Sequence, residues 1–308
     1  MITFPWLRVI LVSGSFFSSA KAYNYIPLWE TLPATPPLPS PITTGHVNMT
    51  DGASIWYGIF GTALSSSCPI SSLYSPILFL HGGFANSDYW DYQLAALQDL
   101  RRPLVVIDTR GHGRSTEGLG ALDYDLFTRD VIAVLHALQI PKVSVVGWSD
   151  GGIIGLDLAM NYSSRLDRVF AFAASYDPSN IPASVDNSSV FNAYLARAET
   201  EYKDLNPYPT HWDVFSEKMN TMWDTLPKWD ATSFADIPNP LRNASAPLIS
   251  IVDADRDEAV ERTTPLQLQE WTEGSVRVIL PGVSHFAFLQ DPTSFTGALR
   301  QFLAIAGV

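Results

Sequence analysis

The chain of 308 residues contains a single cysteine, Cys68. It therefore cannot form an intrachain disulfide or a cysteine-based metal cluster, and its stability must come from a hydrophobic core. A lone cysteine is more often an inert small hydrophobe than a reactive thiol. Because 46% of the residues are hydrophobic, the chain has ample material for such a core.

Positive charge is also scarce, since 19 Lys and Arg face 31 Asp and Glu, for a formal net charge of -12. Such acidity repels phosphate backbones and anionic membrane surfaces, so we expect no nucleic-acid partner. Charged residues make up only 16% of the chain, which excludes the disordered and coiled-coil classes. The length fits one large domain or two small ones, and we find no internal repeat.

The sequence lacks an apolar run long enough to span a bilayer comfortably, so we expect no stable membrane span. At the N-terminus, Arg8 precedes the short apolar run 9–12, and the segment closes on Ala20-Lys21-Ala22. A small residue on each side of one other residue is typical of a signal-peptide cleavage site. We therefore interpret residues 1–22 as a secretory signal peptide and expect an extracellular protein. A membrane anchor or a buried helix is the alternative, disfavoured by the proline, arginine and serines that interrupt the segment.

Four sequons agree with secretion, because the Asn-X-Ser/Thr pattern accepts a glycan only when it is exposed in the secretory pathway. Each sequon alone is weak evidence, since so short a pattern often occurs by chance. The candidate glycosylation sites are Asn48, Asn161, Asn187 and Asn243.

Short apolar runs that alternate with helical spacing dominate the chain after a proline-rich lead-in at residues 23–42. Two alternating runs at 46–49 and 55–60 predict antiparallel strands. The later runs predict a mostly parallel sheet with helices on both faces, a doubly wound α/β fold over residues 43–175 and 241–308. These runs lie at 77–80, 104–107, 143–146, 169–174, 248–252 and 276–280.

The alternation breaks between residues 176 and 240, where prolines, aromatic residues and helical patches are scattered. We interpret this segment as a small helical cap or lid inserted over the carboxyl edge of the sheet. The alternative is a surface excursion that takes no part in binding.

The segment Gly147-Trp148-Ser149-Asp150-Gly151 matches the pattern G-x-S-x-G. An apolar strand leads into it and a helical run leads out, which is the context of a nucleophile elbow. Glycines are needed there because the turn brings backbone segments so close that a Cβ would clash. We predict that Ser149 is a nucleophile, against the alternative of a serine in an ordinary glycine-rich turn.

A serine hydroxyl needs a general base, and His285 is the best placed of the six histidines. It follows the last predicted strand in a loop near the C-terminus, and the order serine, acid, histidine is the one expected for this fold. The loop after the strand at 248–252 offers three aspartates, Asp253, Asp255 and Asp257. We choose Asp257, because the acid usually lies several residues past the strand, and Asp255 is the second candidate.

The segment His81-Gly82-Gly83 follows the first predicted parallel strand, where the second oxyanion donor of such a site originates. We expect the backbone N–H groups of Gly83 and Asp150 to form the oxyanion hole. The carboxylate of Asp150 has two interpretations. It pairs with a cationic or hydrogen-bond-donating part of a substrate, or it bonds to nearby backbone N–H groups and shapes the turn, which we favour.

These motifs, together with Asp108–Ser115 and Ser284-His285-Phe286, resemble the α/β-hydrolase superfamily over about residues 43–305. The elbow GWSDGG resembles that of valacyclovir-hydrolase-like small-ester hydrolases. The resemblance implies that Asp108–Ser115 is a structural turn without a chemical role. A serine nucleophile disfavours the epoxide-hydrolase and dehalogenase branches. Because Ala254 stands where such proteins often have glycine, the choice of Asp257 rests on spacing alone.

These residues predict a secreted serine hydrolase that cleaves a carboxylic ester of a small to medium apolar substrate through an acyl-enzyme. Neither a metal nor an organic cofactor is implied. The first alternative is a hydrolase or cyclase that acts on a secondary metabolite. The second is a non-catalytic binding protein of the same fold, which the intact set of serine, aspartate and histidine disfavours.

We predict that the mature protein begins near Tyr23 and carries N-linked glycans, because the first 22 residues have the form of a signal peptide. N-terminal sequencing of secreted material identifies the first residue, and the mass lost on glycosidase treatment reports the glycans. A cytosolic protein that keeps Met1 would contradict the prediction.

Overall fold

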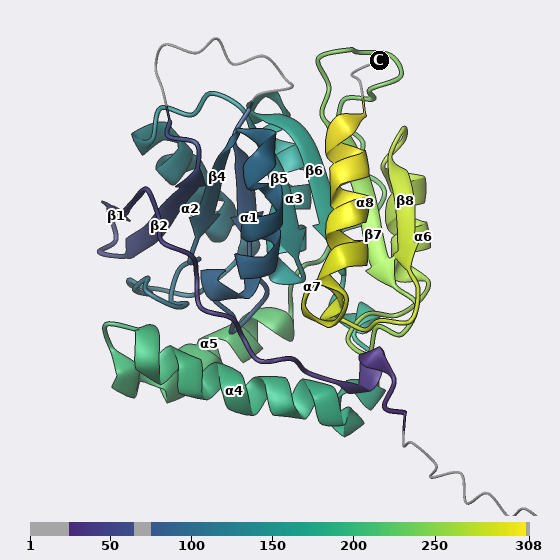
Figure 1. Ribbon diagram of the computed structural model, residues 1–308. Coiled ribbons are helices and arrows are strands. Elements are labelled where there is room, and N and C mark those ends of the chain that lie inside the picture. Colours follow the sequence, from purple (N-terminus) through teal and green to yellow (C-terminus); the bar gives the residue numbers. More distant parts are fainter. Residues whose placement is uncertain (1–24, 65–74, 306–308) are drawn as a thin grey trace, which may run out of the picture.

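The computed structural model describes residues 25–64 and 75–305, and its centre is one eight-stranded sheet (Figure 1). The predicted signal peptide and Cys68 lie outside the described residues. The strand order is β1-β2-β4-β3-β5-β6-β7-β8. The strands are β1 (Thr43–Asn48), β2 (Ser54–Gly61), β3 (Ile77–Leu80), β4 (Pro103–Ile107), β5 (Val143–Trp148), β6 (Leu166–Phe172), β7 (Leu248–Ala254) and β8 (Val276–Leu280).

Strands β1 and β2 are antiparallel to their neighbours, whereas β3 to β8 pair in parallel. Every residue of β3, β5 and β6 is buried, as expected for strands covered on both faces. The edge strand β8 is mostly exposed at its start. The predicted α/β fold with a mostly parallel sheet is confirmed.

Helices cover both faces of the sheet, because successive strand residues point to opposite sides. Leu78, Val105 and Val145 pack in one cluster with α2 and α3, whereas Phe79 and Val106 pack in the other with α1 and α8. The helices are α1 (Asp91–Leu97), α2 (Tyr124–Ala137), α3 (Asp150–Asn161), α4 (Ser189–Leu205), α5 (Trp212–Trp223), α6 (Thr264–Trp271), α7 (Ala287–Gln290) and α8 (Pro292–Ala304). Short 3₁₀ helices occur at Leu28–Glu30, Ser87–Trp90, Gln98–Leu100, Ser163–Arg165, Pro178–Asn180, Ala183–Asn187 and Pro209–His211.

The helix pair α4–α5 lies between β6 and β7 in the sequence and packs across one end of the sheet (Figure 1). Both helices fall within residues 176–240, the segment predicted to form a cap. Phe84, in the loop after β3, contacts Trp212 and Phe215 of α5 at ring-centroid distances of 5.0 and 5.9 Å. Aromatic packing therefore holds the pair over the carboxyl ends of the central strands.

After the 3₁₀ helix Leu28–Glu30, the described part of the proline-rich lead-in runs in extended form beneath the core, along α4 (Figure 1). The guanidinium of Arg197 in α4 donates hydrogen bonds to the carbonyl oxygens of Leu32 and Pro33. On the other side, Gln290 of α7 donates to the carbonyl oxygen of Thr31 at 2.8 Å. The lead-in thus bridges α4 and the core.

The segment Asp108–Ser115 forms a turn held by its own first residue. The buried carboxylate of Asp108 accepts hydrogen bonds from the backbone N–H groups of Ser87 and Arg114, each at 2.8 Å. These bonds satisfy the buried carboxylate and tie the turn to the 3₁₀ helix Ser87–Trp90, which is a structural role.

We predict that Gly151→Ala destabilises the protein by about 2–3 kcal/mol, because overpacking against rigid backbone cannot relax. A Cβ on Gly151 would lie 2.1 Å from the carbonyl oxygen of Leu80. Gly297→Ala in α8 is the control, since nothing lies within 4 Å of its Cβ position. There, alanine should stabilise slightly by restricting the unfolded chain. Urea unfolding measures both variants, and equal stabilities would contradict the prediction.

Candidate active site

Ser149 stands at the turn between β5 and α3 in a left-handed backbone conformation, with φ 53° and ψ -119°. Few residues other than glycine adopt a positive φ, so neighbouring contacts must hold the strain. The backbone N–H of Ser149 donates to the carbonyl oxygen of Phe172 at 2.9 Å. A Cβ on Gly147 would lie 2.0 Å from the carbonyl oxygen of Gly151, so the turn requires glycine there. This geometry is that of a nucleophile elbow.

His285 lies in the loop between β8 and α7, and its Nδ1 is 2.9 and 3.1 Å from the two carboxylate oxygens of Asp257. The two side chains are 4% and 2% exposed. Oδ1 of Asp257 also accepts hydrogen bonds from the N–H groups of Ala259 and Val260, at 2.8 and 3.0 Å. The carboxylate is thus fixed in position beside the imidazole.

Asp255, the second candidate for the acid, faces another way. Its Oδ1 accepts a hydrogen bond from the backbone N–H of Gly282 at 2.7 Å, within the loop after β8. The structure therefore brings Asp257, and not Asp255, to the ring of His285.

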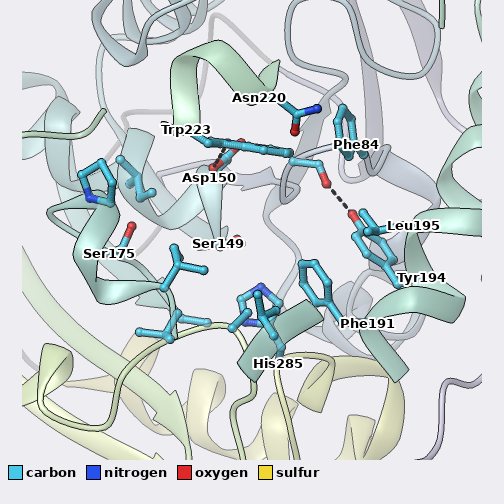
Figure 2. Close-up of a pocket in the computed structure, with 18 of the residues that line it drawn as sticks. Phe84, Ser149, Asp150, Ser175, Phe191, Tyr194, Leu195, Asn220, Trp223 and His285 are labelled. Carbon is cyan, nitrogen blue, oxygen red and sulfur yellow. Dashed lines mark hydrogen bonds between the residues drawn. The ribbon is translucent and has the colours of Figure 1, made fainter. Parts of the chain in front are cut away.

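Ser149 and His285 line one cavity of about 710 Å³. Figure 2 shows Ser149 in the middle of this cavity, with Tyr194 on one side and Ser175 on the other. Side chains of the helix pair α4–α5 line part of the cavity. The lining is mainly apolar, with an aromatic group of Phe84, Phe191, Tyr194, Trp212 and Trp223 and an aliphatic group of Ile153, Ile181, Val185, Leu226 and Val260.

Gly83 and Asp150, the two predicted oxyanion donors, both line this cavity. A Cβ on Gly83 would lie 2.2 Å from the ring of Trp223 and 2.7 Å from Oδ2 of Asp150, so the position requires glycine. The carbonyl oxygen of Gly83 accepts a hydrogen bond from the hydroxyl of Tyr194 (Figure 2). Asp150 is the first residue of α3, where backbone N–H groups have no partner within the helix.

The carboxylate of Asp150 is buried between two aromatic donors. Its Oδ1 accepts from the hydroxyl of Tyr124 at 2.8 Å, and its Oδ2 accepts from the indole N–H of Trp223 at 3.0 Å. The favoured expectation of backbone N–H partners is therefore wrong, because side chains of α2 and α5 supply the donors. Burial raises the pKa of Asp150 to about 6, and these two hydrogen bonds oppose the rise.

Sequence reasoning missed the roles of Tyr124, Trp223 and Tyr194. Tyr124 and Trp223 lie 26 and 73 positions from Asp150, and Tyr194 lies 111 positions from Gly83. The aromatic character of the segment 176–240 was the one signal that could have pointed to Trp223 and Tyr194.

Acidic groups dominate the charge around the cavity. Among the described residues that line it are four acidic ones, Asp150, Asp186, Glu199 and Asp224, and no Lys or Arg. Within residues 25–64 and 75–305, no group of three or more His, Cys, Asp or Glu side chains is arranged to hold a metal ion. The acidic residues of the cavity therefore disfavour anionic groups and accommodate neutral or cationic ones.

Burial changes the protonation of both members of the Asp257–His285 contact. It raises the pKa of Asp257 to about 7, against the hydrogen bonds from Asp253, Ala259 and Val260. It lowers the pKa of His285, and the charges of nearby acidic groups oppose that change. The arrangement favours a neutral imidazole, which can accept a proton from a hydroxyl.

Residues 77–298 match the profile of the alpha/beta hydrolase family. The chain belongs to this family. The resemblance predicted from the motifs is thereby confirmed. None of the helices in the described part of the chain is long and apolar enough to cross a membrane.

Curated relatives and solved structures agree with this membership. Serine hydrolase BPHL from Mus musculus is 26% identical over 238 residues, which cover 74% of this chain and 78% of that protein. A segment of 93 residues, 30% of this chain, is 37% identical to 3-oxoadipate enol-lactonase 2 from Acinetobacter baylyi. The chain spans only 34% to 52% of the length of that protein and three further relatives. The solved enol-lactonase from Burkholderia xenovorans shares the fold, with a TM-score of 0.62 at 19% identity over 84% of this chain and all of that one.

We predict that kcat/KM for a chromogenic ester falls as the pH drops below about 7. The reactive form needs an ionised Asp257 and a neutral His285. Burial raises the first pKa and lowers the second, and a proton taken up by this pair as the pH falls removes the reactive form. A pH–rate profile measures this acid limb, and a midpoint near the ordinary aspartate pKa of about 4 would contradict the prediction.

Proposed function

We propose that this protein is a serine hydrolase that cleaves carboxylic esters or related acyl bonds of small, neutral, mainly apolar substrates. The contact between His285 and Asp257, in the cavity that also holds Ser149 at its strained turn, is the observation that carries the proposal. A nucleophile and a base that line one cavity, with an orienting acid bonded to the base behind it, are the parts that acyl transfer needs.

In the proposed reaction, the imidazole of His285 takes the proton of the Ser149 hydroxyl as the serine oxygen attacks the acyl carbon. The backbone N–H groups of Gly83 and Asp150 stabilise the oxyanion of the tetrahedral intermediate. Asp257 holds the imidazole in one tautomer and stabilises its cationic form. His285 then protonates the leaving alcohol, and a water molecule, activated by the same imidazole, releases the acyl group from Ser149.

The cavity supports a substrate of small to medium size that carries no negative charge. Its volume of about 710 Å³ lies in the range of small-molecule sites, and its lining is mainly aromatic and aliphatic. Its acidic residues have no Lys or Arg beside them among the described lining residues, so an anionic substrate would meet repulsion. The names of two relatives, a lactonase and a serine hydrolase, agree with hydrolysis of an ester or lactone bond.

We also propose that the protein is secreted and N-glycosylated. All four candidate asparagines, Asn48, Asn161, Asn187 and Asn243, are exposed at the surface. Exposure is what a glycan requires, and it supports the proposal without depending on the catalytic site.

We predict that a fluorophosphonate probe labels the wild-type protein and that Ser149→Ala abolishes both labelling and ester hydrolysis, by about 10⁴-fold or more. The probe reacts only with an activated serine, so a non-catalytic binding protein would not be labelled. Mass spectrometry of the labelled peptide identifies the modified residue.

Ser175→Ala is the matched control, because Ser175 also lines the cavity but lies away from His285 (Figure 2). It should keep labelling and most of the activity. Residual activity of Ser149→Ala within about tenfold of wild type would remove Ser149 from the mechanism.

A further inference from the structure

A second carboxyl group lies behind the proposed catalytic acid. Asp253 is the next-to-last residue of β7, is 3% exposed, and pairs across the sheet with Ile279 of β8. One of its oxygens accepts a hydrogen bond from the backbone N–H of Ala254 at 2.7 Å. The charge of Asp257 opposes its ionisation, and that of His285 favours it. An ionised Asp253 would therefore be a buried anion beside another acid, which is costly.

The carboxyl groups of Asp253 and Asp257 are neighbours, close enough to share a hydrogen bond. Two carboxyl groups can share a hydrogen bond only when one of them carries a proton. Asp257 already faces three donors, the N–H groups of Ala259 and Val260 and the ring of His285. Asp257 accepts from these three donors whereas Asp253 accepts from one, so the negative charge is better stabilised on Asp257 and the shared proton belongs to Asp253.

We propose that Asp253 is a positioning residue that remains protonated and donates a hydrogen bond to Asp257, which keeps Asp257 ionised and aimed at His285. Only the predicted effect of this hydrogen bond on catalysis rests on the proposed function. The bond itself is a property of the folded chain and can be measured without a substrate.

The other charged groups around His285 fit a neutral Asp253. The carboxylate of Glu258 accepts a hydrogen bond from the backbone N–H of His285 at 3.2 Å, and Asp150 acts on the ring from the other side. Both charges favour the cationic imidazole, as an ionised Asp253 would also do. A proton on Asp253 removes one of these charges and so helps to keep the pKa of His285 low, and His285 must be neutral to act as a base.

The test compares Asp253→Asn, which keeps a neutral donor of the same shape, with Asp253→Leu, which has the same branched skeleton but no donor. We expect the asparagine variant to keep kcat within about threefold and to leave the acid limb of the pH profile in place. We expect the leucine variant to lose kcat by about tenfold or more with little change in KM. Its acid limb should move up by about one pH unit, because Asp257 loses a hydrogen bond that favours its ionised form.

Ser250→Val is the matched control for a polar-to-apolar change in the same strand. Ser250 is fully buried in β7, and its hydroxyl has no hydrogen-bond partner in the described residues. Its variant should keep the wild-type pH profile. Circular dichroism checks that each variant is folded. If the leucine variant is unfolded, the asparagine variant alone decides the test.

A spectroscopic readout separates failure of this inference from failure of the proposed function. The infrared carbonyl band of a protonated carboxylic acid should be present in the wild type at pH 8 and absent in Asp253→Asn. If the band is present but the wild type neither hydrolyses esters nor reacts with the fluorophosphonate, the proposed function is wrong and the protonated Asp253 stands. An active wild type without the band, a tenfold loss in Asp253→Asn, or an unchanged profile in a folded Asp253→Leu would overturn the inference.

Discussion

Close backbone packing at the turn after β5 is the constraint on which the rest of the site depends. Gly147 and Gly151 let strand, turn and helix approach one another and the end of β3 at distances that leave no room for a Cβ. Ser149 is thereby held in a left-handed conformation that most residues avoid. The buried sheet supplies the rigidity that keeps this strain in place, because its central strands are packed on both faces. The other parts of the cavity are arranged around Ser149, whose backbone is kept from the conformation of an ordinary helix start.

The chemistry of the site is dominated by buried acids around a single imidazole. Asp150, Asp257 and Glu258 are all largely buried, and burial raises the pKa of each. Each also accepts hydrogen bonds from specific donors, which partly replace the water that the carboxylate has lost. The protonation states of these acids and of the imidazole therefore set the electrostatics of this cavity. A neutral substrate adds no further charge to such a balance.

The sequence predicted those features that depend on local pattern. The elbow is a strand, a turn and a helix in direct succession, so its glycines and serine could be interpreted without the fold. The sheet was predictable because its strands are apolar on both faces. The choice between Asp257 and Asp255 rested on spacing, and only the structure shows that Asp255 turns to Gly282. The partners of Asp150 could not be predicted, because they come from α2 and α5, and no periodicity links positions so far apart.

The extended lead-in attaches the helix pair α4–α5 to the core in addition to the contacts of Trp223 with Asp150 and of Tyr194 with Gly83. The covalent connections to β6 and β7 alone would allow the pair to rotate about one edge of the cavity. The hydrogen bonds from Arg197 to Leu32 and Pro33, together with that from Gln290 to Thr31, tie the far side of α4 to α7. Rotation of the pair about these connections requires that the hydrogen bonds to the lead-in break. Opening of the cavity by rotation of the pair therefore costs the free energy of these hydrogen bonds.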